Sequence, residues 1–362
     1  MKIGIVTQPL GYNYGGILQN YALQQILKRL GFESITLDNY YQYSKFRFIA
    51  SYSLSCLFNA IGKKRPYPTK PFNGRNIPKI TGEFISTHIK TIRPNEALTE
   101  KTLKKYDIDT LIVGSDQVWR LYKNKSIYNM YLDFAPSSYK KITYAASFGT
   151  KGWEYDEIQT SKCKQLLKQF EAVSVREHSG IDLVKNYLGY DNAKFVLDPT
   201  LLLNKSDYLS LCSTVPTNSD RYLCAYILDK TDEKIHIINE LASKKGLEMK
   251  LFTAHDELSL SVEEWISQFR DASFVITDSF HGTVFSIIFK QNFIVLPNQK
   301  RGIDRFISIL SVLGLTNRIY GNTDNWKESI QWGKVEHSLG SLRQDSINYL
   351  KDSLLLVDSP KQ

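Results

Sequence analysis

The stretch from Val275 to Phe289 reads VITDSFHGTVFSIIF and contains two apolar runs separated by five residues of different character. The first run has the β-branched composition of a buried strand, and the second has the composition of a buried helix. Between them lies Asp278–Gly282, which includes His281. Ligands of open α/β folds bind beside the carboxyl ends of the strands. The stretch therefore predicts a strand–helix unit and a catalytic or ligand-binding role for His281. The alternative is a core histidine held by one backbone hydrogen bond.

The rest of the chain shows the same alternation of short β-branched runs with helical periods. The strand-like runs are Lys2–Thr7, Ser34–Asp38, Asp109–Gly114, Lys141–Ser147, Ala172–Arg176, Arg221–Leu228, Met249–Thr253, Ala272–Thr277 and Asn292–Leu296. Strands that alternate with helices favour parallel sheets covered on both faces. Two such blocks predict an α/β fold of two Rossmann-like domains.

The length of 362 residues is too great for one compact core. A segment rich in Ser, Thr and Asn, Leu203–Asp220, separates the two blocks. We predict an N-terminal domain over residues 1–205, a C-terminal domain over residues 206–340, and a C-terminal helix and tail over residues 341–362.

The composition is that of a soluble globular protein, with 42% hydrophobic and 23% charged residues. The four cysteines have no metal-ligand spacing, which argues against a zinc site and a disulfide framework. No apolar run approaches the roughly 20 residues of a membrane-spanning helix. The N-terminus lacks the apolar core and cleavage site of a secretory signal. We expect a cytoplasmic protein.

Positive charge is concentrated in one segment, the basic insertion of residues 41–105. It holds 13 Lys/Arg against 3 Asp/Glu, whereas the net charge of the whole chain is +9. The remaining residues are therefore nearly neutral, which argues against nucleic acid as a partner. Basic, aromatic and apolar residues together favour an element lying on an anionic membrane surface. A solvated loop and helix beside the core is the alternative.

Cationic side chains follow two further strands. Arg176 stands at the end of its strand, where it faces the expected crevice. A compact cationic group, Lys300, Arg301 and Arg305, follows the strand after His281. Together these residues predict an anion pocket for a phosphate, a carboxylate or both. The alternative for Arg176 is a structural ion pair with a neighbouring carboxylate such as Glu177 or Asp198.

Several common site motifs are missing. The glycine-rich turn Gly11–Gly16 lacks the GxGxxG pattern of dinucleotide sites, although its glycines permit close approach of an anion or a sugar. There is no GxSxG, no HExxH and no acidic pair at metal-ligand spacing. We expect neither a metal nor a cofactor.

Six segments, in order along the chain, resemble the polysaccharide pyruvyl transferase family. They read NYGGILQNYAL, DTLIVGSDQVW, ITYAASFG, AVSVRE, VLDPTLLL and TDSFHGTVFSIIF. The resemblance runs from about Lys2 to Leu350. It implies a fold similar to the glycosyltransferase-B architecture, with two Rossmann-like domains facing a cleft. It also implies transfer of pyruvate from phosphoenolpyruvate to two hydroxyls of a sugar, which forms a cyclic ketal in cell-surface polysaccharide synthesis.

The resemblance also implies roles for individual residues. The family's catalytic histidine falls on His281, and its phosphoenolpyruvate-binding arginine falls on Arg176. The downstream cations fall on Lys300 and Arg301, and less directly on Arg305.

The chain departs from the family at one point. Some members carry Arg-Leu before the histidine, where this chain has Ser279-Phe280. One cation of the donor site is then missing from its usual place beside the histidine. We expect Lys300 or Arg301 to take its role, with Ser279 beside the donor.

The acceptor implied by the resemblance is a galactose-type sugar in a glycan or a polyprenyl-linked oligosaccharide. Its expected contacts lie in the N-terminal domain and are Asn13, Gly15, Gly16, Ser115, Asp116 and Gln117. The basic insertion would then hold the enzyme at the inner face of the membrane. Two other functions stay open: a nucleotide-sugar glycosyltransferase of the same architecture, and a non-catalytic glycan- or nucleic-acid-binding protein.

Overall fold

The computed structural model describes residues 1–38, 45–62, 77–93, 98–121, 127–253, 260–298, 302–321 and 327–355. Two residues of the expected donor site, Lys300 and Arg301, lie outside these ranges, as does much of the basic insertion.

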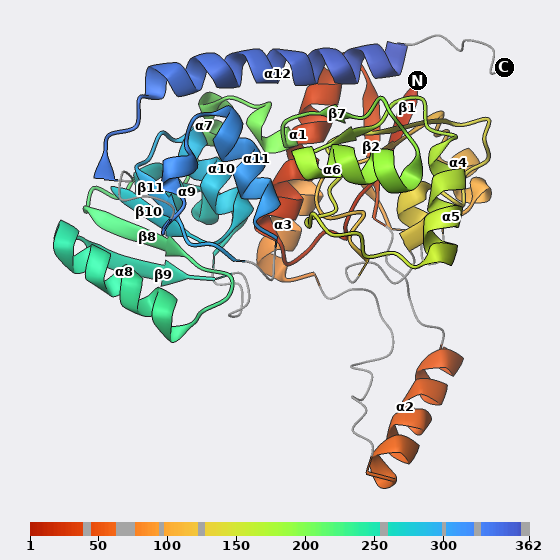
Figure 1. Ribbon diagram of the computed structural model, residues 1–362, viewed down its shortest axis with the longest axis horizontal. Coiled ribbons are helices and arrows are strands. Elements are labelled where there is room, and N and C mark those ends of the chain that lie inside the picture. Colours follow the sequence, from red (N-terminus) through yellow and green to blue (C-terminus); the bar gives the residue numbers. More distant parts are fainter. Residues whose placement is uncertain are drawn as a thin grey trace.

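The first half of the chain forms a parallel sheet of five strands in the order β3-β2-β1-β4-β5 (Figure 1). The strands are β1 (Lys2–Val6), β2 (Glu33–Leu37), β3 (Thr91–Ile92), β4 (Thr110–Val113) and β5 (Lys140–Thr143). Two short parallel strands, β6 (Ser174–Val175) and β7 (Lys194–Phe195), continue the sheet beyond β5 through a bridge between Ala146 and Val175.

Helices cover both faces of this sheet because successive side chains of each strand point to opposite sides. In β4, Ile112 packs in the hydrophobic cluster that includes α1, whereas Leu111 and Val113 pack in the cluster that includes α5. The helices of this half are α1 (Tyr14–Arg29), α3 (Lys79–His88), α4 (Glu100–Lys105), α5 (Glu157–Leu167) and α6 (His178–Leu183).

The second half forms a four-stranded parallel sheet in the order β11-β10-β8-β9. Its strands are β8 (Tyr222–Tyr226), β9 (Glu248–Phe252), β10 (Phe274–Thr277) and β11 (Phe293–Val295). Its helices are α8 (Asp232–Lys245), α9 (Val262–Asp271), α10 (Phe280–Ile288) and α11 (Asp304–Val312). A short helix, α7 (Lys205–Leu211), lies in the segment that was predicted to separate the domains.

The two halves pack directly against each other. Residues of α1 share one hydrophobic cluster with α9 and α10 of the second half. Tyr14 stacks on Trp265 with ring centroids 5.4 Å apart, and its hydroxyl donates to the Leu260 carbonyl at 2.6 Å. The predicted fold class, α/β with two Rossmann-like domains, is confirmed.

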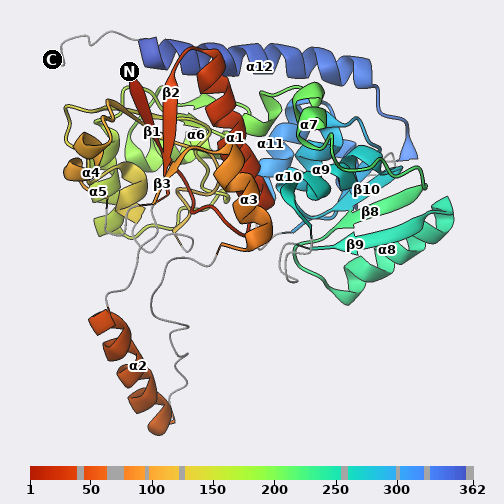
Figure 2. The same cartoon turned by 180° about the vertical axis from the view of Figure 1, so that it is seen from behind.

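The last helix, α12 (Trp332–Leu355), runs from the second domain back across the first (Figures 1 and 2). Hydrogen bonds tie it to the first domain: Tyr349 Oη donates to the Thr143 carbonyl at 3.0 Å, and Ser346 Oγ accepts from the Leu197 amide at 3.0 Å. The helix was expected from residue 341 and begins nine residues earlier, at Trp332. The earlier turns include Gly333, but a helical glycine costs only about 1 kcal/mol, which buried apolar contacts offset.

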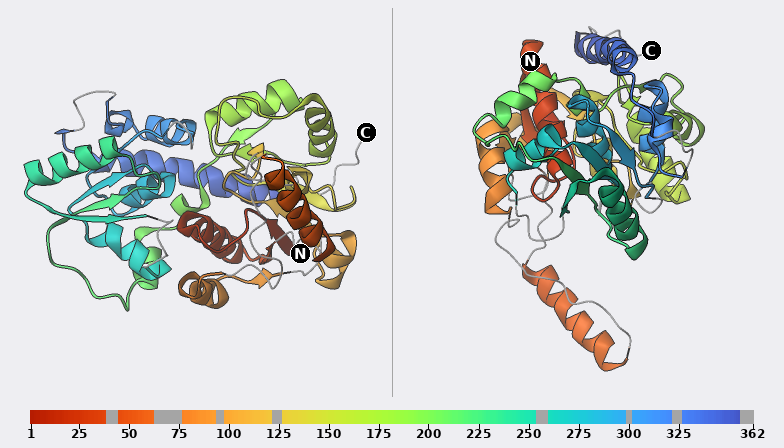
Figure 3. Two further views of the ribbon diagram at one scale, coloured as in Figure 1. Left: turned by 90° about the horizontal axis from the view of Figure 1, so that it is seen from below. Right: turned by 90° about the vertical axis from the view of Figure 1, so that its left-hand side faces the viewer.

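One helix stands apart from both domains. α2 (Lys45–Ala60) projects from the body of the molecule, as Figure 1 and the right-hand view of Figure 3 show. Within the described ranges, none of the helices has the length and hydropathy needed to cross a bilayer.

Candidate active site

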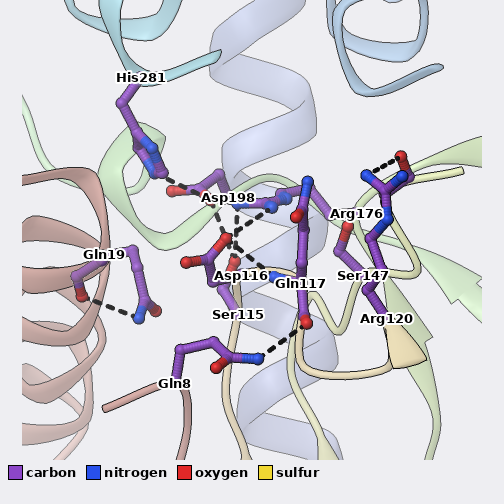
Figure 4. Close-up of polar contacts among 12 residues, drawn as sticks. Gln8, Gln19, Ser115, Asp116, Gln117, Arg120, Ser147, Arg176, Asp198 and His281 are labelled. Carbon is purple, nitrogen blue, oxygen red and sulfur yellow. Dashed lines mark hydrogen bonds and ion pairs between the residues drawn. The ribbon is translucent and has the colours of Figure 1, made fainter. Parts of the chain in front are cut away.

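The carboxylate of Asp198 is the centre of a buried polar cluster between the two domains (Figure 4). Asp198 follows β7 and caps the short helix η4 (Pro199–Leu201), where its Oδ1 accepts from the amide and the hydroxyl of Thr200 at 3.0 and 2.6 Å. Its Oδ2 accepts from Arg176 Nη1 at 2.6 Å and from Ser115 Oγ at 3.0 Å. One oxygen therefore fixes the carboxylate in place, and the other faces the expected site residues.

Arg176 lies at the end of β6, as the sequence predicted, and its side chain is 1% exposed. Besides Asp198, its guanidinium lies 3.5 Å from Asp116 Oδ1. Burial by itself lowers the pKa of Arg176, but Asp198, Asp116 and Glu177 outweigh burial and raise it. Arg176 thus stays charged. It also forms the buried ion pair with Asp198 that was the alternative prediction for this residue.

Asp116 follows β4 in a left-handed backbone conformation, with φ of +80°. Aspartate tolerates this region better than most residues because its side chain can bond the local backbone, and here Oδ1 accepts from the Gln117 amide at 2.8 Å. Its other oxygen accepts from Asn13 Nδ2 at 3.2 Å. Burial raises the pKa of Asp116, but Arg176 and His281 outweigh it, so the pKa is lowered overall. Asp116 is therefore a carboxylate that pairs with Nη2 of Arg176, whereas Asp198 pairs with Nη1.

His281 comes from the second domain and approaches the same carboxylate, with Nε2 3.7 Å from Asp198 Oδ2. The helix that carries it begins at Phe280, so His281 lies in the first turn. Ser279 caps this helix by accepting from the Gly282 amide at 3.3 Å. The Nε2 atom of His281 is buried and has no hydrogen-bond partner among the described residues.

Two glycines allow the histidine to lie in this position. A Cβ added to Gly15, in the first turn of α1, would lie 1.9 Å from Nδ1 of His281. A Cβ added to Gly282 would lie 2.3 Å from Oγ1 of Thr277, at the end of β10. The first glycine makes room for the imidazole across the domain interface. The second lets the helix start directly at the end of its strand.

Arg305, on α11, brings a second buried guanidinium to the cluster. Its Cζ lies 5.5 Å from the centre of the Phe280 ring, and that of Arg176 lies 4.6 Å from the same ring. Burial, followed by the charge of Arg176, lowers the pKa of Arg305 to about 10. Phe280 is part of the departure from the family motif, and two cations meet at its ring.

Glu177 fastens the loop after β5 to the cluster. Its Oε1 accepts from Ser147 Oγ and from the amides of Phe148 and Gly149, at 3.0, 2.7 and 3.1 Å. The second domain packs closely on this loop, since a Cβ added to Gly302 would lie 1.7 Å from the Gly149 carbonyl oxygen. Glu177 thus supports the place where the two domains meet.

The residues expected to bind an acceptor fall into two groups. Ser115 and Asp116 have side chains engaged with Asp198 and Arg176, inside the charged cluster. Asn13, at the start of α1, is exposed and reaches Asp116. Gly16 and Gln117 are buried beside them, and Gln117 accepts a hydrogen bond from Gln8 through its carbonyl at 2.9 Å. Gly15 borders the imidazole of His281, and the binding of a sugar by these six residues stays a prediction.

Sequence reasoning missed the central place of Asp198. It treated this residue only as a possible ion-pair partner of Arg176. The signal was present in Asp198-Pro199-Thr200, an acidic residue and a proline at a strand end, which is typical of a cap. The sequence contains no comparable signal for the role of Glu177, because two of the three groups that it binds are backbone amides, which no residue type indicates.

The arrangement suits two chemical tasks. Guanidinium groups are suited to anions such as phosphate and carboxylate, and in the cluster Arg176 already pairs with the carboxylates of Asp198 and Asp116. An imidazole beside a carboxylate can give and take a proton, with the carboxylate orienting the ring.

Three solved structures align with most of this chain at low sequence identity. An uncharacterized protein of Klebsiella pneumoniae is 14% identical and has a TM-score of 0.46, over 88% of this chain and 90% of that one. A UDP-GlcNAc 2-epimerase of Neisseria meningitidis is 10% identical with a TM-score of 0.46, over 99% and 95%. A glycosyltransferase of Streptomyces is 12% identical with a TM-score of 0.42, over 97% and 99%.

The family comparison is more specific. No curated protein matches the sequence. The family model of polysaccharide pyruvyl transferase matches residues 13–300, which include Asp116, Arg176, Asp198 and His281. The match spans most of the chain and confirms the resemblance carried by its six motifs. The chain belongs to the polysaccharide pyruvyl transferase family.

Proposed function

We propose that the protein transfers pyruvate from phosphoenolpyruvate to two hydroxyls of a sugar, which yields a cyclic ketal and phosphate. The observation that carries this proposal is the meeting of His281 with Asp198 beside two buried arginines. Phosphoenolpyruvate has a carboxylate and a phosphate, and reaction at its enol phosphate requires a proton donor for C3. The cluster offers arginine side chains for the carboxylate and the phosphate, and His281 as the acid/base group for the enol.

The donor is proposed to lie against Arg176 and Arg305. Arg176 is balanced by two carboxylates, whereas burial lowers the pKa of Arg305. Burial disfavours the charged guanidinium, and a phosphate beside Arg305 would stabilise that charged form, which favours anion binding at this position. Lys300 and Arg301 stay proposed donor contacts from the sequence. Ser279 is proposed to act through the helix start that it caps.

His281 is proposed to serve the proton transfers. Protonation of C3 of phosphoenolpyruvate makes C2 electrophilic, and a sugar hydroxyl then forms a bond to C2 as it loses its proton. The C2–O bond to phosphate breaks, and the second hydroxyl closes the ring while its proton leaves with phosphate or solvent. A positioned acid/base group contributes roughly 10²–10⁴-fold to such steps. The nearby arginines stabilise the charge of the departing phosphate.

The acceptor is proposed to be a galactose-type sugar, in a glycan or on a polyprenyl carrier, within cell-surface polysaccharide synthesis. It would approach from the first domain, where Asn13 is exposed at the start of α1, close to Asp116. An amide and backbone N–H groups are suitable donors and acceptors for sugar hydroxyls.

Incubation of the full-length protein with phosphoenolpyruvate and a panel of galactosides tests the proposal. We expect release of phosphate, with a pyruvate-sized mass gain on the acceptor that requires both substrates. UDP- and dTDP-sugars, supplied with the same acceptors, form the second arm. Turnover of a nucleotide sugar without any use of phosphoenolpyruvate would replace the proposal with a glycosyltransferase. Binding of glycans without any turnover would indicate a non-catalytic protein.

A further inference from the structure

Helix α2 carries an unusual share of the exposed apolar surface. Twelve large hydrophobic residues are exposed among those that the structure describes, and five belong to α2 and the turn after it. They are Ile49, Tyr52, Leu54, Leu57 and Ile61. Figures 1 and 3 show that this helix projects away from both domains, so neither domain covers these side chains. A contiguous apolar surface of this kind marks an interaction site.

Apolar side chains lie among the exposed residues of α2 in a mixed pattern, since Ser53 is also exposed and Phe58 is half-buried. The polar residues Ser55 and Asn59, one turn apart, are buried and half-buried. Leu57, between them in sequence, is 62% exposed. A helix on the surface of a soluble domain normally turns its apolar stripe inward and its polar face to water. The outward apolar face of α2 therefore fits a medium less polar than water.

The charge around α2 identifies the kind of partner. Residues 39–82 contain eight Lys/Arg residues and neither Asp nor Glu. This charge attracts an anionic surface, and the lipid headgroups of a cytoplasmic leaflet provide one. Nucleic acid would satisfy the charge, but its phosphate backbone offers no partner for Leu54, Leu57 and Ile61. An anionic bilayer satisfies both the positive charge and the apolar side chains.

The length of α2 decides how it would meet the bilayer. Its 16 residues span about 24 Å at 1.5 Å per residue, which is less than the roughly 30 Å of the hydrocarbon core. The helix is thus suited to lie in the interfacial region rather than to cross it.

We propose that α2 is a membrane-docking helix that lies in the interface of an anionic bilayer. Its exposed apolar side chains enter the boundary between headgroups and acyl chains, and the positive charge of residues 39–82 adds attraction to the headgroups. The two domains then stay at the membrane surface. This proposal is independent of the ketal chemistry proposed above.

The cysteines of the chain allow a direct test. Cys56 lies on α2 and is exposed, whereas Cys163, Cys212 and Cys224 are buried. An environment-sensitive fluorophore can therefore be attached to Cys56 of the full-length native protein. We expect a blue shift when vesicles of phosphatidylcholine and phosphatidylglycerol are added, and no comparable shift with phosphatidylcholine alone. Flotation of unlabelled protein with the same vesicles gives a second readout.

Matched variants connect the binding to α2. The double substitution Leu54→Asp and Leu57→Asp should reduce the vesicle-bound fraction by about tenfold or more, because charged groups enter the interface poorly. Ile158→Asp is the control, since Ile158 is 76% exposed on α5, and it should leave vesicle binding unchanged. Thermal unfolding of each variant confirms that it is folded.

Three results would overturn the membrane proposal: no spectral shift with anionic vesicles, equal binding of the double variant, or equal binding to vesicles without anionic lipid. None of these measurements uses phosphoenolpyruvate or a sugar. A failure of the proposed reaction therefore leaves this test intact, and the reverse also holds.

Discussion

Nε2 of His281 lies 3.7 Å from Oδ2 of Asp198, and the same oxygen accepts a 2.6 Å hydrogen bond from Arg176. One carboxylate oxygen thus joins the histidine of the second domain to a cation of the first. The site is complete only where the domains pack together, and α12 holds them in this arrangement through its contacts with the first domain.

Asp198→Asn should impair both activity and stability. The asparagine amide lacks the negative charge that Asp198 presents to Arg176 at 2.6 Å, so only the 3.5 Å pair with Asp116 remains. Removal of one partner from a buried ion pair costs about 3 kcal/mol of unfolding free energy. The imidazole loses its orienting carboxylate, so kcat should fall by about 100-fold or more. Denaturant unfolding and steady-state kinetics measure the two effects.

Asp207→Asn is the matched control, since Asp207 pairs with Arg29 at the surface. Loss of this ion pair in Asp207→Asn should change the unfolding free energy by less than about 1 kcal/mol. Equal losses of stability in the two variants would contradict a special role for Asp198.

The stability of the protein should depend on pH through Asp198. Burial by itself raises the pKa of this carboxyl, but its interactions with His281 and Arg176 hold the pKa well below the usual range. A carboxyl with a depressed folded pKa stabilises the fold above its unfolded pKa of about 4 and loses this contribution as the pH falls.

The unfolding free energy of the native protein should therefore decline below about pH 5, with a slope steeper than that of Asp198→Asn by up to about 1.4 kcal/mol per pH unit. Asp116, whose pKa is also lowered, is present and titrates in both proteins. Denaturant titrations over this pH range give both slopes. Parallel slopes would show that Asp198 has no such coupling.

Gly15→Ala should lower activity without a large loss of stability in α1. The new Cβ would lie 1.9 Å from Nδ1 of His281, so the imidazole must move. A displacement of about 1 Å in a catalytic group can cost about 100-fold in rate. Gly340→Ala makes the same chemical change inside α12, where no atom lies within 4 Å of the new Cβ, and its kcat should equal that of the native protein. A Gly15→Ala protein with native kcat would show that the position of the imidazole does not matter.

The fold was largely predictable because most of the parallel strands are short apolar runs, several of them rich in β-branched residues, and helices alternate with them. The boundaries of the strands were less predictable. The strand expected over Lys141–Ser147 is β5, Lys140–Thr143, and beyond it Ala145 adopts a left-handed conformation with φ of +54°. The sequence does not predict this end of the strand, because alanine rarely adopts a positive φ.

The site was predictable in part for a similar reason. Arg176 and His281 follow strands, and the carboxyl edge of a parallel sheet brings such residues together. Asp198 and Gly15 gain their importance from contacts across the domain interface, which a single sequence does not specify. The glycine is required only because an imidazole from a residue far along the chain occupies the space of its Cβ.

Arg305→Gln should weaken the binding of phosphoenolpyruvate more than it slows turnover. Hydrogen bonds to charged groups contribute about 1.5–3 kcal/mol, so KM for phosphoenolpyruvate should rise by about 10- to 100-fold. Arg29→Gln, at the exposed pair with Asp207, should leave KM unchanged. Steady-state kinetics with varied phosphoenolpyruvate distinguishes this outcome from a general loss of active enzyme, which would lower kcat alone.

The most direct test of the account compares native protein with His281→Ala for ketal formation from phosphoenolpyruvate and an acceptor sugar. We expect the native protein to form one phosphate per ketal. The variant should retain its fold by circular dichroism and lose roughly 10²–10⁴-fold in kcat. Ketal formation by His281→Ala at the native rate would contradict the assignment of His281 as the acid/base group.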